Sequence, residues 1–211
     1  MQPEHLILTI GRQIGSGGLS VARDLSERLG IEMYDKQLLT EAAAASGLST
    51  EVFERRDEKP RRLHLRSIFT GRPFSTSSSD MLTRGGLNDE ALFKVQSDVM
   101  RTLAGKAPCI FVGRCADYVL RDFPRLFSVF ITCGFDERVA RVASERGIGE
   151  GAAADLIRQA EKARAGYYNY FTFKKWGDSA SYDLCINSSS AGGSAATADI
   201  IHFTLKQKNY I

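Results

Sequence analysis

Short apolar runs alternate along this chain with longer segments that place apolar residues on one helical face. The short runs are rich in β-branched and aromatic residues, as is typical of buried strands, and they cover residues 6–10, 31–34, 109–114, 127–132 and 182–186. Helical spacing follows in residues 19–29, 36–45, 88–105, 136–146, 150–166 and 195–206, and Ser49 is expected to cap one more helix. This alternation predicts an α/β fold with a parallel sheet and helices on both faces.

The first strand leads into a glycine-rich turn and then a helix, in the sequence ILTIGRQIGSGGLSVARDL at residues 7–25. A strand, a glycine turn and a helix direct backbone N–H groups and a helix N-terminus at an anion. Side chains in such a turn would hold a phosphate away from the backbone. We therefore expect nucleotide phosphates to bind here, at Gly11, Arg12, Gly15, Ser16, Gly17, Gly18, Leu19 and Ser20.

This turn departs from the standard phosphate-binding motif G-x-x-x-x-G-K-[ST], whose lysine reaches the β- and γ-phosphates. With the second glycine of the motif on Gly17, Gly18 occupies the lysine position and Gly11 lies one residue too far upstream. Ser20 is then the nearest hydroxyl for Mg²⁺. A contact aimed at transition-state charge contributes about 3 kcal/mol, so the missing lysine matters. Arg12 and Lys162 are candidate substitutes.

The turn taken alone leaves other interpretations open. Gly15, Gly17 and Ser20 nearly satisfy the dinucleotide motif G-x-G-x-x-G, and Asp35 lies about where its ribose-binding acid would. A glycine turn without any ligand is the third interpretation.

Composition limits the class of protein. The 211 residues suffice for one domain, and a net charge of +3 is too small to indicate a nucleic-acid partner. The longest apolar run is far short of a membrane span, and we expect no signal peptide because a strand is predicted within five residues of the first residue. The four cysteines form no C-x-x-C pair and are expected to be buried free thiols in a reducing cytoplasm.

Two polar segments interrupt the pattern. Residues 57–87 contain two prolines, a serine run and six basic residues, which fits either a solvated loop or a mobile arm that faces an anionic substrate. Residues 188–194 are rich in serine and glycine and are expected to be only a connector.

Ligands of parallel α/β sheets bind beyond the carboxyl ends of the strands. That rule selects the glycine turn, Asp35, Arg114 and the residues after Thr132. The planar guanidinium of an arginine binds phosphate oxygens in pairs and stays charged, so Arg114 is a strong candidate for a phosphate contact.

Several segments resemble the cytidylate kinase-like family, a branch of the nucleoside monophosphate kinases. These are the LTIGRQIGSGG turn at 8–18, YDKQLL at 34–39, VGRCADYVL at 112–120, and the segment IRQAEKARAGYYNYFTFKKWGDSASYDLCINSS at 157–189. The resemblance implies a three-layer fold with a five-stranded parallel sheet. It further implies a core (1–36, 88–148 and 182–211), an acceptor-binding arm (about 37–87) and a lid (about 149–175). It also favours a kinase over a dinucleotide oxidoreductase.

The resemblance implies roles for individual residues. Asp35 and Lys36 would lie beside the acceptor, and Gly113 with Arg114 would bind its phosphate. Asp117 would orient Arg114 or cap the local turn. The lid would bring Arg158, Lys162 and Arg164 to the moving phosphoryl group. Glu161, the acid between them, would help to bind the acceptor.

The expected activity is transfer of phosphate from ATP, with Mg²⁺, to a CMP-like nucleoside monophosphate or a similar small acceptor. The expected protein is a cytoplasmic monomer or homodimer without a membrane or nucleic-acid partner. The alternative is a nucleotide-binding sensor or regulatory protein, because Gly18 replaces the lysine.

Overall fold

The structure, a computed structural model, describes residues 4–36, 38–39 and 86–211. Most of the helix expected at 36–45, the helix expected after Ser49 and nearly all of the polar segment at 57–87 lie outside the described residues. The chain forms two compact units, residues 1–39 with 100–211, and residues 40–99. The site described below lies in the first unit. The division into core, arm and lid stays a prediction, as do the oligomeric state and the cytoplasmic location.

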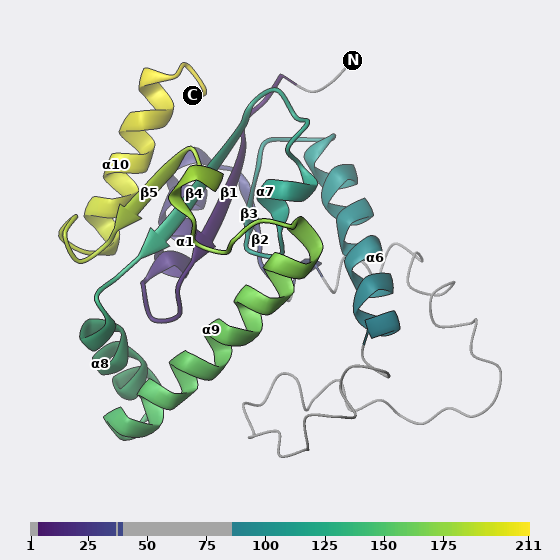
Figure 1. Cartoon of the computed structure of the whole chain (residues 1–211). Coiled ribbons are helices and arrows are strands. Elements are labelled where there is room, and N and C mark those ends of the chain that lie inside the picture. The colour runs from purple at the N-terminus through teal and green to yellow at the C-terminus, as the bar shows by residue number, and fades with distance from the viewer. Residues whose placement is uncertain (1–3, 37, 40–85) are drawn as a thin grey trace. The chain divides into compact units, whose positions relative to one another are not determined.

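Five parallel strands form one sheet in the order β2-β3-β1-β4-β5 (Figure 1). β1 is central, and its Ile10 pairs with Val112 of β3 on one side and Val129 of β4 on the other. The loop after β1 therefore lies between the loops that follow β3 and β4. The strands are β1 (Ile7–Arg12), β2 (Glu32–Tyr34), β3 (Cys109–Val112), β4 (Leu126–Thr132) and β5 (Leu184–Asn187).

The sheet confirms the predicted fold class, an α/β fold with a five-stranded parallel sheet. The described helices are α1 (Gly18–Leu29), α6 (Gly86–Ala104), α7 (Ala116–Val119), α8 (Phe135–Arg146), α9 (Glu150–Thr172) and α10 (Ser194–Gln207), with a 3₁₀ turn at Ser179–Ser181. The short helix α7 has no counterpart among the predicted elements, and α9 continues to Thr172 rather than ending at residue 166. Few apolar positions mark α7, because it is a single turn.

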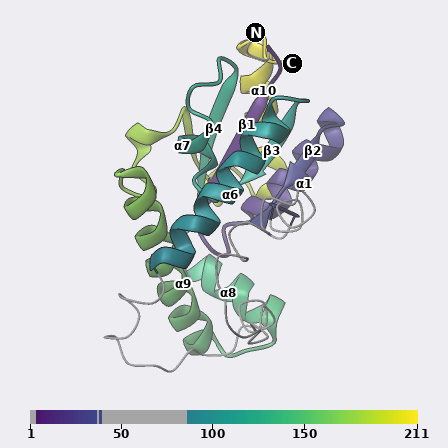
Figure 2. The ribbon, with the colours of Figure 1, turned by 90° about the vertical axis from the view of Figure 1, so that its right-hand side faces the viewer.

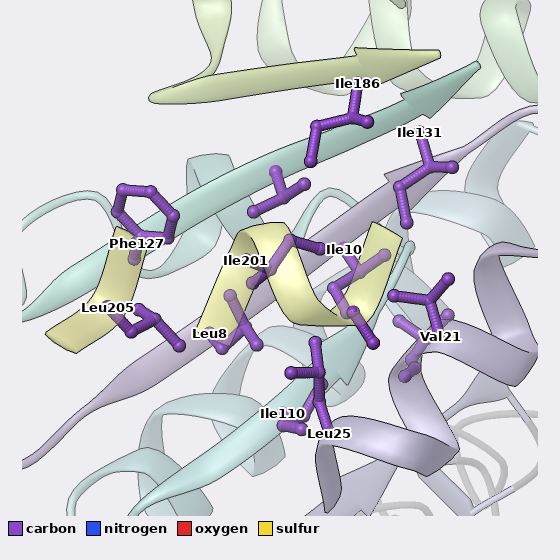
Figure 3. Packing of buried hydrophobic residues seen from close by; sticks show 14 of the residues in the cluster. Leu8, Ile10, Val21, Leu25, Ile110, Phe127, Ile131, Ile186, Ile201 and Leu205 are labelled. Atoms are coloured by element: carbon purple, nitrogen blue, oxygen red, sulfur yellow. The ribbon is translucent and has the colours of Figure 1, made fainter. Parts of the chain in front are cut away.

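α1 and α10 cover one face of the sheet. Alternate residues of β1 point to this face, and side chains of both helices pack on them (Figure 3). The centre of this cluster is fully buried and consists of Leu8, Ile10, Val21, Leu25 and Ile201. Residues between them in β1, such as Ile7, point to the opposite face and are equally buried. Packing on both faces fixes the position where β1 ends.

Aromatic rings and α7 cover the opposite face near the carboxyl ends of the strands. Phe130 of β4 contacts Trp176 and Tyr182, with ring centroids 5.3 and 4.9 Å apart. This packing ties the segment after α9 to the sheet. α8 and α9 lie side by side beyond the carboxyl ends of the strands (Figures 1 and 2). Helices and loops from distant parts of the chain therefore meet at this edge.

Of the four cysteines, Cys109, Cys115 and Cys133 are buried free thiols as expected, whereas Cys185 is exposed and the expectation of burial is wrong there. Cys185 lies on β5, an edge strand whose side chains are less covered. Burial raises the pKa of Cys109 and of Cys115 to about 12, so both stay protonated. Within the described part of the chain, no helix is long and apolar enough to cross a membrane.

Candidate active site

The loop between β1 and α1 exposes a row of backbone donors. Gly15 and Gly17 have φ of 74° and 77°, a left-handed conformation that glycine adopts without strain. The N–H groups of Gly15, Gly17, Gly18, Leu19 and Ser20 have no hydrogen-bond acceptor among the described residues. Together with the N-terminus of α1, they form the kind of site that binds phosphate.

Neighbouring segments hold this loop in place. Gln13 accepts a hydrogen bond from the N–H of Cys133 at 3.2 Å, and the Ser188 hydroxyl donates to the carbonyl of Ser16 at 2.8 Å. A side chain at Gly17 would overlap the Ser194 hydroxyl. The prediction that residues 188–194 are only a connector is therefore wrong, because both ends of that segment touch the loop. Serine is common in connectors, so these contacts have no signal in the sequence.

α8 presents two arginines to the same loop, and the sequence reasoning missed both. Arg141 donates a hydrogen bond to the carbonyl of Gly15. Arg138, only 5% exposed, donates to the carbonyl of Ile14 in the loop at 3.4 Å and to the carbonyl of Cys133 at 3.1 Å. The two lie three residues apart and so share one face of α8. That spacing is visible in the sequence RVAR, but nothing there indicates what the face meets.

Glu161 of α9 contacts the loop rather than the cavity described below. Its carboxylate forms a 2.5 Å ion pair with Arg138 and accepts the N–H of Ile14 at 3.3 Å. Packing of Ile157 and Ala153 against Val139 holds α9 on α8 beside this pair. The sequence assigns Glu161 to the acceptor; the structure gives its carboxylate a contact that seats α9 on the phosphate-binding loop.

The remaining basic residues of α9 separate onto two faces. Arg164 follows Glu161 by three residues and lies on the partly buried face, whereas Arg158 and Lys162 are exposed. Arg158 pairs with Asp155 at 3.2 Å. Of the three basic residues expected to reach the reacting group, the structure therefore brings only Arg164 to the cavity described next.

A cavity of about 320 Å³ opens beside the loop, at the carboxyl ends of β1 and β3. Arg12 ends β1, and Arg114 follows β3. Arg164 donates from α9 to the carbonyl of Arg12 at 3.2 Å. The lining is formed by Gly11, Arg12, Lys36, Val112, Gly113, Arg114, Cys115, Asp117, Ala163, Arg164, Tyr167, Tyr168, Trp176 and Tyr182.

The cavity concentrates positive charge. The pKa of Arg12 is lowered to about 9, chiefly by burial and then by the charges of Arg164 and Arg114, against an opposing effect of Asp35. Burial, then Arg114 and Arg164, likewise lower the pKa of Lys36. Burial lowers the pKa of Arg164; the charge of Glu161 partly offsets this shift, and the charge of Arg114 adds to it. Mutual repulsion of these groups favours an anion between them.

Arg114 occupies an unusual backbone conformation. Gly113, Arg114 and Cys115 are all left-handed, with φ of 78°, 58° and 57°. This costs roughly 1–2 kcal/mol for each non-glycine residue. The turn directs the chain from β3 into α7, where the N–H of Ala116 bonds the carbonyl of Gly113 at 3.2 Å. The guanidinium of Arg114 lies over the ring of Tyr167, 5.4 Å from its centroid.

The acidic candidates have identifiable contacts. Asp117 accepts a 2.6 Å hydrogen bond from Tyr168, another residue that sequence reasoning did not assign to the site. Burial raises the pKa of Asp117, although this bond and Lys174 oppose the shift. Asp35, after β2, accepts the N–H of Leu38 at 3.1 Å and is close enough to Arg12 to affect its pKa. Among the described residues, no group of three or more His, Cys, Asp or Glu could hold a metal ion.

A family model supplies independent information about this arrangement. The model of the cytidylate kinase-like family matches residues 7–190, which include the loop, the cavity and α9. The chain belongs to the cytidylate kinase-like family. This confirms the resemblance drawn from the sequence motifs. Membership supports a phosphotransferase that uses a nucleotide, and it leaves the acceptor open.

Solved structures show the same fold. An uncharacterized protein from Eubacterium ventriosum is 27% identical, with a TM-score of 0.70 and coverage of 96% of this chain and 99% of that one. Shikimate kinase from Bacteroides thetaiotaomicron is 13% identical, with a TM-score of 0.50 and coverage of 95% and 98%. The second likeness shows the fold alone. No curated protein matches the chain.

The contact of Glu161 predicts a loss of stability on substitution. Replacing Glu161→Gln leaves the buried Arg138 without its counter-charge, so we expect the free energy of unfolding to fall by about 3 kcal/mol. The control Asp155→Asn removes an exposed pair of the same helix and should cost less than about 1 kcal/mol. Urea denaturation measures both. Equal effects of the two substitutions would contradict the structural role of Glu161.

The crowding of charges predicts that Arg12 destabilises the ligand-free protein. Its pKa is lower in the folded protein than in the unfolded chain, so protonation of Arg12 opposes folding below about pH 9. Arg12→Met keeps the aliphatic stem and should raise Tm near neutral pH; each 1 kcal/mol gained corresponds to about 2–4 °C. As pH rises through about 9, wild type loses this penalty and the difference should narrow. A variant less stable than wild type at neutral pH would refute this.

The left-handed turn predicts a difference between two variants of Arg114. Both Arg114→Gly and Arg114→Met remove the charge, but only glycine relieves the strain at φ 58°. We expect the glycine variant to be more stable than the methionine variant by about 1 kcal/mol. Thermal unfolding of the two proteins side by side gives the difference. A more stable methionine variant would mean that the turn is not strained.

Proposed function

We propose that this protein is a phosphotransferase that moves the γ-phosphoryl group of ATP to a small anionic acceptor. The observation that carries the proposal is the convergence of four cationic side chains, Arg12, Lys36, Arg114 and Arg164, on one cavity. This cavity lies beside the loop N–H groups that have no acceptor among the described residues. Phosphoryl transfer needs this kind of positioning and charge neutralisation more than it needs covalent help from the protein.

The loop would hold the donor. In this proposal the N–H groups of Gly15 and of residues 17–20 bind the β-phosphate, and the exposed Ser20 hydroxyl in the first turn of α1 contributes a ligand to Mg²⁺. Arg141 already touches the loop at Gly15 and adds a positive charge on the side of α8. The Mg²⁺ would supply charge neutralisation on the phosphate oxygens.

The cavity would hold the acceptor. Arg114, Arg164 and Lys36 would bind its anionic group, because guanidinium groups grip phosphate or carboxylate oxygens in pairs. Asp35 would orient the hydroxyl or phosphate oxygen that attacks. That oxygen forms a bond to the γ-phosphorus as the bond to the β-phosphate oxygen breaks and ADP leaves. A volume of about 320 Å³ suits a small acceptor, such as a CMP-like nucleoside monophosphate.

The exposed residues of α9 have a conditional role in this proposal. Arg158 and Lys162 lie on the outer face of α9 in this structure and would approach the phosphates only if the proposed lid turned. Asp117 would shape the cavity through its bond to Tyr168 rather than contact the phosphoryl group.

A nucleotide sensor is the second candidate, because Gly18 stands where the standard motif has lysine. Such a protein would bind ATP through the loop and transfer phosphate poorly or not at all. Binding alone cannot separate the two functions, whereas turnover can.

The experiment combines thermal-shift and coupled transfer assays over a panel of acceptors. The panel contains nucleoside monophosphates and shikimate, with an ATP analogue and Mg²⁺ present or absent. We expect one acceptor and the ATP analogue to stabilise the protein together, because a ligand that binds only the folded state raises Tm. The same acceptor should be phosphorylated in the coupled assay.

Variants of one arginine locate the acceptor. Arg114→Met should reduce transfer by about a hundredfold or more and abolish stabilisation by the acceptor, while stabilisation by the ATP analogue remains. The control Arg121→Met removes an exposed arginine that stacks on Tyr118 and should change neither. Binding of ATP without transfer to any acceptor would favour the sensor. No stabilisation by any nucleotide would refute the proposal.

A further inference from the structure

The sequence of the loop exchanges two residue types relative to the standard motif. When Gly17 and Gly18 take the positions of the second glycine and the lysine of G-x-x-x-x-G-K, the first glycine falls on Arg12. The chain thus has a cation where the motif has glycine, and glycine where the motif has its cation. In the folded chain these two positions lie together.

Arg12 fills the space that a side chain at position 18 would need. A Cβ atom added to Gly18 would lie 2.7 Å from the Cβ of Arg12 and 3.0 Å from its Cγ, both too close for an ordinary contact. The stem of Arg12 therefore runs along the start of α1. Glycine at position 18 is explained by this stem.

A second glycine clears the far end of the same side chain. Gly113, after β3, has φ of 78°, and a Cβ added there would overlap the Nη1 atom of Arg12. Two glycines from distant parts of the chain thus make room for one side chain. Its stem is fixed beside the loop, and its guanidinium is fixed beside the cavity.

The position of this guanidinium is central to the site. Arg114, Arg164 and Asp35 are near enough to shift its pKa, and Arg12 lines the cavity itself. The carbonyl of Arg12 also accepts the 3.2 Å hydrogen bond from Arg164. The charge therefore lies between the unpaired N–H groups of the loop and the proposed acceptor.

We infer that Arg12 is the catalytic cation that replaces the missing lysine, supplied from the end of β1 instead of from the start of α1. It contacts the γ-phosphoryl group of the bound nucleotide and stabilises the charge on that group during transfer. This inference rests on the proposed function. The other candidate substitute, Lys162, is exposed on the outer face of α9, and Arg141 is engaged with the Gly15 carbonyl.

The test moves the charge back to its standard position. Four variants are compared with wild type: Arg12→Met, Arg12→Gly, Gly18→Lys, and the double variant Arg12→Gly/Gly18→Lys. The measured quantities are the affinities for AMP-PNP and for ADP, both with Mg²⁺, and the rate of ATP turnover with the best acceptor or with water. The control Arg23→Met removes an exposed arginine of α1 and should leave all of them unchanged.

We expect Arg12→Met and Arg12→Gly to slow turnover by about a hundredfold or more. Both should weaken AMP-PNP binding more than ADP binding, because only AMP-PNP carries a γ-phosphate. Gly18→Lys alone should be impaired by its overlap with the Arg12 stem. The double variant removes that overlap and should recover at least about tenfold of the turnover lost in Arg12→Gly, which is about 1.4 kcal/mol.

The outcomes distinguish this inference from the proposed function. Wild-type turnover in Arg12→Met, or an unchanged preference for AMP-PNP over ADP, would overturn the role of Arg12 and leave the phosphotransferase standing. Absence of nucleotide binding in wild type would overturn both. If Gly18→Lys proteins fail to fold, Arg12→Lys decides: partial turnover with retained preference for AMP-PNP supports the inference, and activity no better than that of Arg12→Met overturns it. An Arg12→Met protein that is less active but more stable than wild type would support a catalytic role of Arg12, because loss of a purely structural residue would lower stability.

Discussion

Repulsion among like charges at one edge of the sheet is the constraint to which the rest of this unit is adapted. Arg12, Arg114, Arg164 and Lys36 share a cavity in which burial and their mutual field lower the pKa of three of them, Arg12, Lys36 and Arg164. A fold that served stability alone would separate these groups or pair them with acids. Among the described residues, the carboxylates that raise the pKa of these groups are Asp35 and Glu161, and Glu161 is already shared with Arg138 and the N–H of Ile14. Under the proposed function, an anion that enters the cavity would offset the repulsion among the cations, so the feature that weakens the ligand-free protein would strengthen its complex.

The architecture supports this arrangement through elements that are far apart in the sequence. β1 is buried on both faces and ends at Arg12, so its carboxyl end has little freedom. The left-handed turn after β3 presents Arg114 on the neighbouring strand, at a cost in backbone strain that is common at functional sites. α9 is seated by Glu161 on one side and by the aromatic packing after Thr172 on the other, and Arg164 lies between these two anchors. Each of the three arginines thus comes from a segment whose position is fixed by contacts away from the cavity.

Much of the fold follows from the sequence, and less of the site does. The alternation of apolar strands and amphipathic helices is a local property, so the strands and the position of the loop were predictable. The rule that ligands bind beyond the carboxyl ends of parallel strands also selected Arg114 and Asp35, and both lie at that edge of the sheet. It could not show that Ser188 and Ser194 contact the loop, since serines in a polar segment carry no directional signal. The inner face of α9 follows helical spacing and contains Ile157, Glu161, Arg164 and Tyr168, whereas Arg158 and Lys162 lie outside it. The spacing alone does not tell which face is buried, so the sequence did not separate Arg164 from the two exposed residues. The strain at Arg114 and Cys115 has no sequence signature at all, because neither residue favours a positive φ.

The exchange between Arg12 and Gly18 shows why a missing motif residue need not mean a missing function. A motif records the positions from which side chains depart, whereas chemistry depends on where their charged ends arrive. A lysine on the first turn of a helix and an arginine at the end of the preceding strand start on opposite sides of the same loop, and both are long enough to place a cation near a bound phosphate. The exchange is not free of consequence, because an arginine stem along α1 excludes any side chain at position 18 and a guanidinium at Gly113 excludes one there. Arg12 therefore requires glycine at positions 18 and 113, although a comparison of motifs treats these three positions as independent. A planar guanidinium carries several N–H groups, whereas an ammonium acts as a point charge. The guanidinium of Arg12 can therefore contact the nucleotide and the phosphoryl acceptor at the same time. A cation that lies between two anionic ligands gains from that geometry, so the exchange preserves the chemistry of the missing lysine.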